Sequence, residues 1–422
     1  MALSKNSKKL LMMFLFTAMF LLIYRFGTRL QLPFVNGDML TGQTKEMFGF
    51  LDVFSGQALS NFSILALGIS PYITASIVVQ LLQMDILPVL KEWSEEGPAG
   101  KQKINQLTKY IALGLAFVQS LTLTLGLPDY FTSGFSNAPI NYVYLALVAT
   151  AGTAFSMWLA EKITKRGIGN GTSMLIVAGI LSSFPAMFGE LGITHLSPGQ
   201  LKGILTFIAI VLTFLAVIVG IVFMEQATRK IPIQYANRPA AANFRGKSDS
   251  NIPIKLNSAS VIPVIFAATL MSIPTTIIQM TGNSEAGFGR VLYSIFSQTE
   301  TIGFVIYVVL IFVFSFFYAF LQMNPEKMAE NLQKNNAYIP GVRPGEETAS
   351  FISRVLFKVT MVGATYLSIV ATLPIILTKI FNLSSSVQIG GTGLIIVVGV
   401  AIETAKQIKN QKQDQQYRGF IN

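Results

Sequence analysis

Few residues of this chain belong to the types that perform covalent or metal chemistry. The chain has no cysteine, which excludes disulfides, thiolate metal sites and a cysteine nucleophile. Its single histidine, His195, falls in a connection between apolar segments, so metal chemistry of the HExxH type is excluded. The stretch Gly167–Gly171 (GIGNG) matches neither the dinucleotide-binding nor the P-loop pattern, and we interpret it as a tight turn. The sequence therefore predicts a protein that is not an enzyme and binds no cofactor or metal.

Ionisable groups inside the apolar segments are equally scarce. Arg25 and Arg29 lie near the end of the first segment, from where long side chains can snorkel to the interface, and Glu403 lies near the end of the last. A proton-coupled pump needs a buried relay of Asp, Glu or His residues, and the spans contain none. A small-solute secondary transporter is a better alternative than an enzyme or a pump, because transporters bind their substrates at interrupted spans.

The composition is that of a polytopic membrane protein. The chain has 422 residues, 52% hydrophobic and 12% charged, with a mean hydropathy of +0.56. Soluble domains carry about 25% charged residues. The formal net charge of +11 would suit nucleic-acid binding, but basic cytoplasmic loops explain it better in so apolar a chain.

Ten apolar segments approach the length that crosses a bilayer, which is about 20 residues for a helix. They are Leu10–Leu30, Ile64–Leu82, Ile111–Leu127, Ile140–Leu159, Met174–Phe188, Ile204–Met224, Val261–Ile278, Ile302–Leu321, Val359–Ile376 and Gly391–Ile408. With the N-terminus in the cytoplasm, 25 of the 31 Lys and Arg residues fall on the inside and six on the outside. This asymmetry predicts that both termini are cytoplasmic and that the number of spans is even.

The second apolar segment is not a plain membrane helix. Within Phe62–Asp85, Gly68 and Pro71 interrupt the first half, and Leu51–Asn61 upstream is too short and too polar to span. Irregular backbone at membrane depth survives only where protein or a water-filled cavity satisfies it. The segment therefore predicts a cavity around which the other spans are arranged.

Ten spans also allow two pseudo-symmetric halves, as in many transport folds. The Pro263 region is a loose counterpart, in the second half, of the interrupted second span. We assign the parts of the chain as a first half (1–190), the start of the second half (191–225), a cytoplasmic loop (226–257) and the rest of the second half (258–422), with a cytoplasmic loop at 323–358 and a cytoplasmic tail at 410–422.

Two cytoplasmic connections, Glu225–Asn257 and Met323–Lys358, are each longer than 30 residues. Loops beyond about 15 residues are usually functional or disordered. In the second connection, Asn324 and Pro325 predict the start of a short amphipathic helix that runs to about Gln333.

Further along the second connection, Pro340-Gly341 and Pro344-Gly345 bracket Arg343. Proline and glycine favour tight turns, so this stretch predicts a rigid tip. Such a tip suits the presentation of one arginine to a partner, whereas a solvated loop held by turns is the plainer alternative.

Seven stretches together resemble one family. They are ALGISPYITASIVVQLLQMD, EWSEEGPAGKQKINQLTKYIALGLAFVQS, RGIGNG, RKIPIQYANR, NIPIKLNSASVIPVIFAA, NPEKMAENLQKNNAYIPGVRPGEETASFI and GGTGLIIVVGVAIETAKQI. In order and spacing, from about residue 50 to the C-terminus, they resemble the SecY family of the Firmicute type. That family forms the channel of the bacterial Sec protein translocon.

The resemblance implies an all-α fold with ten transmembrane helices in two five-helix halves around a central pore. A short plug helix would comprise Asp52, Val53, Phe54, Ser55, Gly56, Gln57, Ala58, Leu59, Ser60 and Asn61. A pore ring would comprise Ile69, Ile73, Thr172, Ile176, Ile265 and Ile396. Ile69 and Ile73 are four residues apart and share a helix face. Branched apolar side chains around a neck exclude water and ions by dewetting. Thr172 departs from the aliphatic residue that the family usually has there.

In the resembling family the halves part between the second and third helices on one side and the seventh and eighth on the other. Gln80, Gln119 and Asn257 would form a polar seam of this lateral gate. Ordinary hydrogen bonding between membrane helices is an equally good explanation of these three polar groups.

The long loops resemble the family's docking site for a motor ATPase and the ribosome. The residues assigned to docking are Arg343, Arg229, Lys230, Arg238, Arg245 and Lys247. The stretch AAANFRGKSDSN departs from the more basic turn usual in the family, so Arg245 and Lys247 match less well.

The resemblance implies a channel in the bacterial cytoplasmic membrane that conducts unfolded polypeptides and releases apolar segments into lipid. Its partners would be SecE-like and SecG-like small subunits, the SecA motor, the ribosome, precursors with signal sequences and membrane lipid, with no direct nucleic-acid binding except through the ribosome. An accessory paralogue dedicated to a few substrates, and the small-solute transporter, remain as alternatives.

Overall fold

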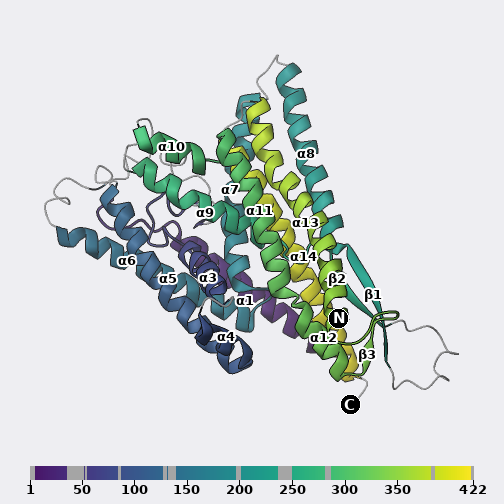
Figure 1. Ribbon diagram of the computed structural model, residues 1–422. Coiled ribbons are helices and arrows are strands. Elements are labelled where there is room, and N and C mark those ends of the chain that lie inside the picture. Colours follow the sequence, from purple (N-terminus) through teal and green to yellow (C-terminus); the bar gives the residue numbers. More distant parts are fainter. Residues whose placement is uncertain are drawn as a thin grey trace.

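The computed structural model describes residues 5–35, 52, 55–83, 87–126, 131, 139–195, 201–235, 250–280, 287–381 and 385–419, which form a helical bundle with a small sheet at one end (Figure 1). Its helices are α1 (Lys5–Gly27), α3 (Ser70–Leu82), α4 (Pro88–Glu95), α5 (Pro98–Gly126), α6 (Pro139–Arg166), α7 (Gly171–His195), α8 (Leu201–Gln226), α9 (Ile262–Met280), α10 (Gly287–Phe296), α11 (Thr301–Gln322), α12 (Pro325–Lys334), α13 (Glu346–Phe381) and α14 (Ser385–Gly419). Its strands are β1 (Thr228–Tyr235), β2 (Ser250–Lys255) and β3 (Ala337–Tyr338).

The helices account for the predicted membrane segments. Seven helices of the described ranges are long and apolar enough to cross a membrane, namely α1, α5, α6, α7, α8, α11 and α13. Two shorter apolar helices, α3 and the Ile262–Thr275 part of α9, coincide with the second and seventh predicted segments, and α14 contains the tenth. The helical membrane fold is therefore confirmed. His195, which we expected in a connection, is instead the last residue of α7.

The second predicted segment is helical only in its second half. Helix α3 begins at Ser70 and carries Pro71 in its first turn, while turns occupy residues 62–69. Gly68 lies in the left-handed region with φ of 51°, and its backbone N–H donates to the carbonyl of Leu65. The predicted irregular backbone is thus present, and it is satisfied by local turns buried inside the protein.

Helix α9 begins in the same way as α3. It starts at Ile262, carries Pro263 in its first turn and follows a series of turns over residues 256–261. Proline suits the first helical turn because the N–H that it lacks would have no partner there. The two helices contact each other, so the two proline-initiated spans meet inside the bundle.

A three-stranded antiparallel sheet joins the two long connections and corrects our view of them as loops and turns alone. In β1–β2, Thr228 pairs with Lys255 and Ile233 with Ser250. In β1–β3, Gln234 pairs with Tyr338. Ile231 and Ile233 are two residues apart and so share one face of a strand, a spacing that was available in the sequence. The two connections are one structural unit.

The sheet is fastened to the bundle by its apolar face. Ile231 of β1 and Ile254 of β2 are buried in a cluster with Ile352 and Leu356 of α13. Helix α13 has 36 residues, or about 54 Å at 1.5 Å per residue, which exceeds the roughly 30 Å hydrocarbon core of a bilayer. The helix therefore reaches beyond the membrane, where its first turns support the sheet.

The outer surface of the bundle is apolar. On α8, Leu212, Val219 and Phe223 are each at least 60% exposed. Apolar faces of this extent mark lipid or a partner. Figure 1 places the start of α1, the end of α14, the sheet, α4 and α12 toward one end of the molecule and α10 toward the other.

Candidate functional site

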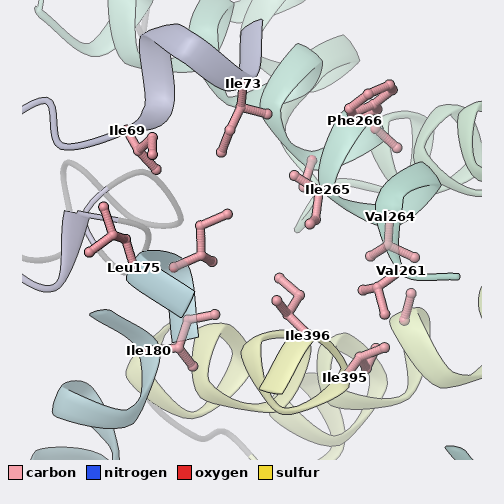
Figure 2. Packing of buried hydrophobic residues seen from close by; sticks show 14 of the residues in the cluster. Ile69, Ile73, Leu175, Ile180, Val261, Val264, Ile265, Phe266, Ile395 and Ile396 are labelled. Atoms are coloured by element: carbon pink, nitrogen blue, oxygen red, sulfur yellow. The ribbon is translucent and has the colours of Figure 1, made fainter. Parts of the chain in front are cut away.

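Five of the six residues assigned to the pore ring lie in one buried apolar cluster. These are Ile69, Ile73, Ile176, Ile265 and Ile396, none of them more than 9% exposed. They come from the start of α3, the start of α9 and the bodies of α7 and α14. In Figure 2, Ile69, Ile73, Ile265 and Ile396 point toward one another across the space between these helices. Residues up to 327 positions apart in the chain thus converge on one neck.

The cluster contains further apolar side chains that the sequence did not single out. Leu175 and Ile180 of α7, Val261 and Val264 at the start of α9, and Ile395 of α14 belong to it (Figure 2). Ile176 and Ile180, like Val261 and Ile265, are four residues apart and share a helix face. That spacing was readable in the sequence, but it is equally typical of ordinary membrane packing.

This neck can exclude water and ions but cannot perform chemistry. Its side chains offer no hydrogen bonds, and a narrow apolar constriction dewets. Hydrophobic contacts are non-directional, so the side chains can separate around a passing chain of any sequence and close again. Thr172 lies in the first turn of α7, where its N–H donates to Asn170 Oδ1 at 3.1 Å. It is half-buried one turn before Ile176, and its part in the ring stays a prediction.

The segment assigned to the plug is compact and buried. Asp52 accepts a hydrogen bond from the Ser60 N–H at 2.8 Å, and the Ser55 hydroxyl donates to the Asp52 carbonyl at 2.9 Å. Ser55, Ala58, Leu59 and Ser60 are each at most 3% exposed. These local bonds hold the segment together.

The predicted plug helix does not continue to Asn61. Ser55 is helical, but turns follow, because Gly56 and Gln57 have φ of 71° and 65° and leave the right-handed helical region. Val53 and Phe54 lie outside the described residues.

Arg25 and Tyr24 of α1 reach this segment. Arg25 Nη1 donates to the carbonyl of Gly56 at 2.6 Å, and the Tyr24 hydroxyl donates to the carbonyl of Ser55 at 3.3 Å. The expectation that Arg25 snorkels to the interface is therefore wrong, because its guanidinium finds a backbone acceptor inside the protein.

The helices that the resemblance assigns to a lateral gate contact one another. Both α3 and α5 contact α9. Gln80 of α3 donates through Nε2 to Ser76 Oγ at 3.1 Å, one turn earlier on the same helix. The place of Gln80 in a seam of the gate stays a prediction. Gln119 is half-buried on α5, and its role in the gate stays a prediction.

Asn257 is engaged elsewhere. Its Nδ2 donates to Glu225 Oε2 at 3.1 Å, and the Ser260 hydroxyl donates to Glu225 Oε1 at 3.3 Å. Lys406 Nζ donates to the Glu225 carbonyl at 2.9 Å. The buried Glu225 carboxylate thus fixes the approach to α9 against the end of α8, and these contacts do not join Asn257 to a seam with Gln80. In the sequence, Glu225 could have been singled out because it is a lone acidic residue at the end of a long apolar run.

We predict that Asn257→Ala destabilises the fold. It removes one of the donors to the buried Glu225 carboxylate, and an unsatisfied buried partner costs about 1–3 kcal/mol. Thermal unfolding of the purified protein in detergent measures the loss. Ser258→Ala is the matched control, since the Ser258 hydroxyl donates only to the nearby Lys255 carbonyl and to a sulfur of Met323 at 3.9 Å. Equal unfolding temperatures for the two variants would contradict the assigned role.

Comparison with known proteins decides the family. The SecY family model matches residues 63–405. The chain is 44% identical over 412 residues to a protein translocase subunit SecY of Halalkalibacterium halodurans, with 96% of each chain covered. It is 44% identical over 417 residues to the SecY subunit of Bacillus subtilis, covering 96% of this chain and 95% of that protein. The chain belongs to the SecY family.

Solved structures agree on the SecY fold. One described as the structure of a protein conducting channel matches with a TM-score of 0.63 and 19% identity, covering 96% of this chain and 93% of that chain. Sec61 in a canine ribosome-channel complex matches with a TM-score of 0.60 and 18% identity over the same shares.

Three of the six residues predicted to dock a partner lie on the shared sheet and on the tip that contains Arg343. Arg229 and Lys230 are exposed on β1. The Arg343 side chain is 87% exposed and lies 3.9 Å from the Glu347 carboxylate. Arg238, Arg245 and Lys247 lie outside the described residues.

The predicted turn chemistry around Arg343 is present in the SecY chain. Gly341 and Gly345 have φ of 82° and 105°, values that favour glycine. The Arg343 carbonyl accepts a hydrogen bond from the Thr348 hydroxyl at 2.8 Å. The backbone of the tip is thus fixed while its arginine side chain points into solvent.

Helix α12 precedes the tip and matches its predicted bounds within one residue. It runs from Pro325 to Lys334, and Asn324 caps it by accepting hydrogen bonds from the N–H groups of Glu326 and Lys327. Lys327 Nζ also lies 3.7 Å from Glu95 of α4, so connections from the two parts of the chain meet here.

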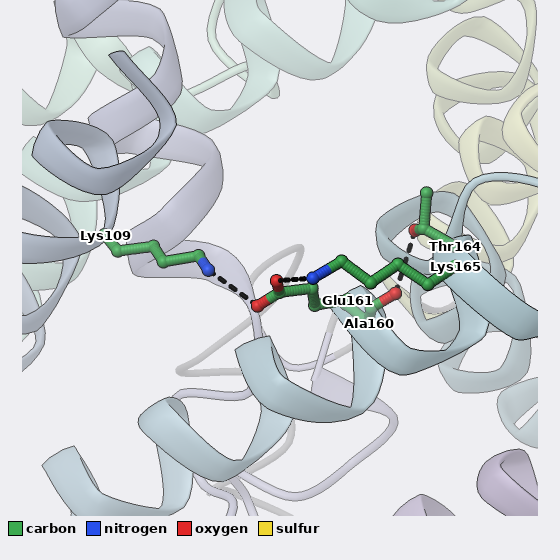
Figure 3. A network of polar contacts seen from close by, with 5 residues as sticks. All are labelled: Lys109, Ala160, Glu161, Thr164 and Lys165. Atoms are coloured by element: carbon green, nitrogen blue, oxygen red, sulfur yellow. Dashed lines mark hydrogen bonds and ion pairs between the residues drawn. The ribbon is translucent and has the colours of Figure 1, made fainter. Parts of the chain in front are cut away.

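An ion network ties two helices of the first part of this SecY chain together (Figure 3). Lys109 of α5 lies 2.6 Å from Glu161 of α6, which also binds Lys165 at 2.7 Å. The network therefore joins α5 to α6, and α5 in turn packs on α3. Among the described residues, no group of His, Cys, Asp and Glu residues could hold a metal ion.

Proposed function

We propose that this chain is the channel-forming subunit of a bacterial Sec translocon, which conducts unfolded polypeptides across the membrane and releases apolar segments into the bilayer. The observation that carries the proposal is the convergence of five isoleucines from four helices on one buried neck. A neck of this kind seals against ions yet binds no particular sequence. Membership of the SecY family supports the same function.

Opening requires the neck and the seam beside it to part. The proposed hinge lies between a first half, residues 1–190, and a second half, residues 191–422. Helices α7, α8 and α14 contact one another on one side, whereas on the other side α3 and α5 meet α9. We assign the first set to the hinge and the second to the lateral gate, where an apolar segment of the substrate enters lipid.

The energy for moving a polypeptide through the channel comes from partners rather than from this chain. The sheet and the Arg343 tip are the proposed docking platform for the SecA motor ATPase and for the ribosome. SecE-like and SecG-like small subunits would clamp the two halves. Two of the solved structures with this fold are described as complexes with a ribosome, a canine ribosome-channel complex and a yeast Ssh1 complex bound to the 80S ribosome, which supports a ribosome as partner. The asymmetry of Lys and Arg residues supports a cytoplasmic position for both termini and for the platform.

Cross-linking to a stalled precursor tests this proposal. Because the chain lacks cysteine, single cysteines can be introduced without removing any. A precursor carrying one cysteine and a folded C-terminal domain is trapped in transit and then oxidised. We expect disulfides with Ile73→Cys and Ile265→Cys, which line the neck. Leu212→Cys and Val313→Cys, both more than half exposed on the outer surface, are controls and should not react. Equal reaction at all four positions would refute the proposed path.

A further inference from the structure

The plug segment is held to the bundle at two places with different kinds of bond. At its far end, backbone bonds join it to the chain that follows α1: Leu32 N–H donates to the Phe62 carbonyl at 2.7 Å, and Ile64 N–H donates to the Leu30 carbonyl at 2.8 Å. At its near end, the bonds are the side-chain bonds from Arg25 and Tyr24 described above. The first attachment is a short piece of sheet-like pairing, and the second depends on individual side chains.

The Arg25 bond is the stronger of the two side-chain bonds. It is 2.6 Å long, against 3.3 Å for the bond from Tyr24. A hydrogen bond from a charged donor is roughly twice as strong as a neutral one, and it is stronger still at low local dielectric. Within the part of the chain that the structure describes, the guanidinium is matched by no carboxylate, and its other acceptor is Thr28 Oγ1 at 3.3 Å. The Gly56 carbonyl is thus the main partner of the charge.

Gly56 is the residue of the plug that Arg25 contacts. Its left-handed backbone, with φ of 71°, directs the carbonyl to Arg25. A Cβ at this position would lie 2.9 Å from the Cα of Gly179 on α7, closer than real Cβ atoms approach. Gly179 directly precedes Ile180 of the apolar cluster. Gly56 therefore lies between α1 and α7, the helix that carries Ile176 and Ile180 of the neck.

From these contacts we propose that Arg25 is the positioning residue that latches the plug in the closed channel, and that its bond to the Gly56 carbonyl breaks when the plug moves. Because the acceptor is a backbone carbonyl, the latch works whatever side chains the plug carries. The backbone pairing at Leu30–Leu32 persists and serves as the hinge. The proposal rests on the channel function proposed above.

Labelling of a buried cysteine on the plug tests the latch. Ala58 is fully buried, so Ala58→Cys should react slowly with a membrane-impermeant maleimide added from outside to vesicles holding the channel. Adding Arg25→Gln should speed the reaction about tenfold, which corresponds to the loss of one charge-assisted hydrogen bond. Arg25→Lys keeps a cationic donor and should restore most of the protection. Arg29→Gln removes the same charge from an exposed position one turn away and should change nothing.

Two outcomes separate the latch from the channel itself. Each variant is also assayed for transport of a precursor with an intact signal sequence, which all should retain. Normal transport with equal labelling in the Arg25→Gln and Arg29→Gln variants would overturn the latch and leave the channel intact. Transport by none of them would refute the channel function. Arg25→Met, which keeps a long side chain but has no hydrogen-bond donor, is the second variant if Arg25→Gln fails to fold, and labelling no faster than that of the Ala58→Cys parent would then overturn the latch.

Discussion

Vesicles that contain the chain with serine at Ile73, Ile176 and Ile396 should leak ions at rest about tenfold faster than vesicles with the unaltered chain. The three side chains belong to the buried neck and offer no polar group. Serine is smaller and carries a hydroxyl, so it widens the constriction and lets water remain in it, which abolishes dewetting. Resting conductance across planar bilayers, without motor or precursor, is the measurement.

The matched control replaces three exposed isoleucines, Ile208, Ile302 and Ile369, which lie on the outer surface of α8, α11 and α13. The chemical change is the same, and the neck is untouched. We expect the conductance of this control to equal that of the unaltered chain. Equal leakage in the two triple variants would show that the cluster is packing rather than a seal.

Replacing Arg343 with glutamate should lower motor-driven export about tenfold, because a like-charge contact at an interface costs several kcal/mol. The side chain is 87% exposed, and its 3.9 Å contact with Glu347 is worth little at such exposure. The fold and membrane insertion should therefore be preserved. ATP-dependent protection of a precursor from protease, with SecA added at limiting concentration, measures the effect.

Arg290→Glu is the control for this prediction. Arg290 is exposed on α10 at the other end of the molecule (Figure 1), so the same charge change occurs away from the platform. Excess motor should partly rescue Arg343→Glu if docking is weakened. Undiminished export at limiting motor would mean that the tip is only a turn.

The periodic and local features of the fold could be predicted from sequence. The lengths of the apolar segments predicted the spans. The pair Asn324-Pro325 predicted the start of α12, because a capping residue and a proline act on the end of their own helix. Gly68 and Pro71 marked the break in the second span for the same local reason. The isoleucines of the neck came only from the family resemblance, since each alone is indistinguishable from ordinary packing.

The features that were missed depend on contacts between distant residues. The sheet forms because Ile231 and Ile254 bury against α13, about 100 positions further along the chain, and neither strand is stable alone. Asn257 bonds Glu225 across the first long connection rather than the gate. Arg25 turns inward because Gly56, 31 positions away, brings a carbonyl to it. No local pattern encodes these partners.

Reconstitution into vesicles is the most direct test of the central claim that this chain is a protein-conducting channel. The chain is incorporated with the proposed SecE-like and SecG-like subunits, purified SecA motor, ATP and a precursor with a signal sequence, and protease-protected precursor is scored. We expect protection that requires both this chain and ATP. Absence of protection with well-incorporated chain, across general and unusual precursors alike, would contradict the channel, and a motor-independent flux of a small solute driven by an ion gradient would favour a transporter instead.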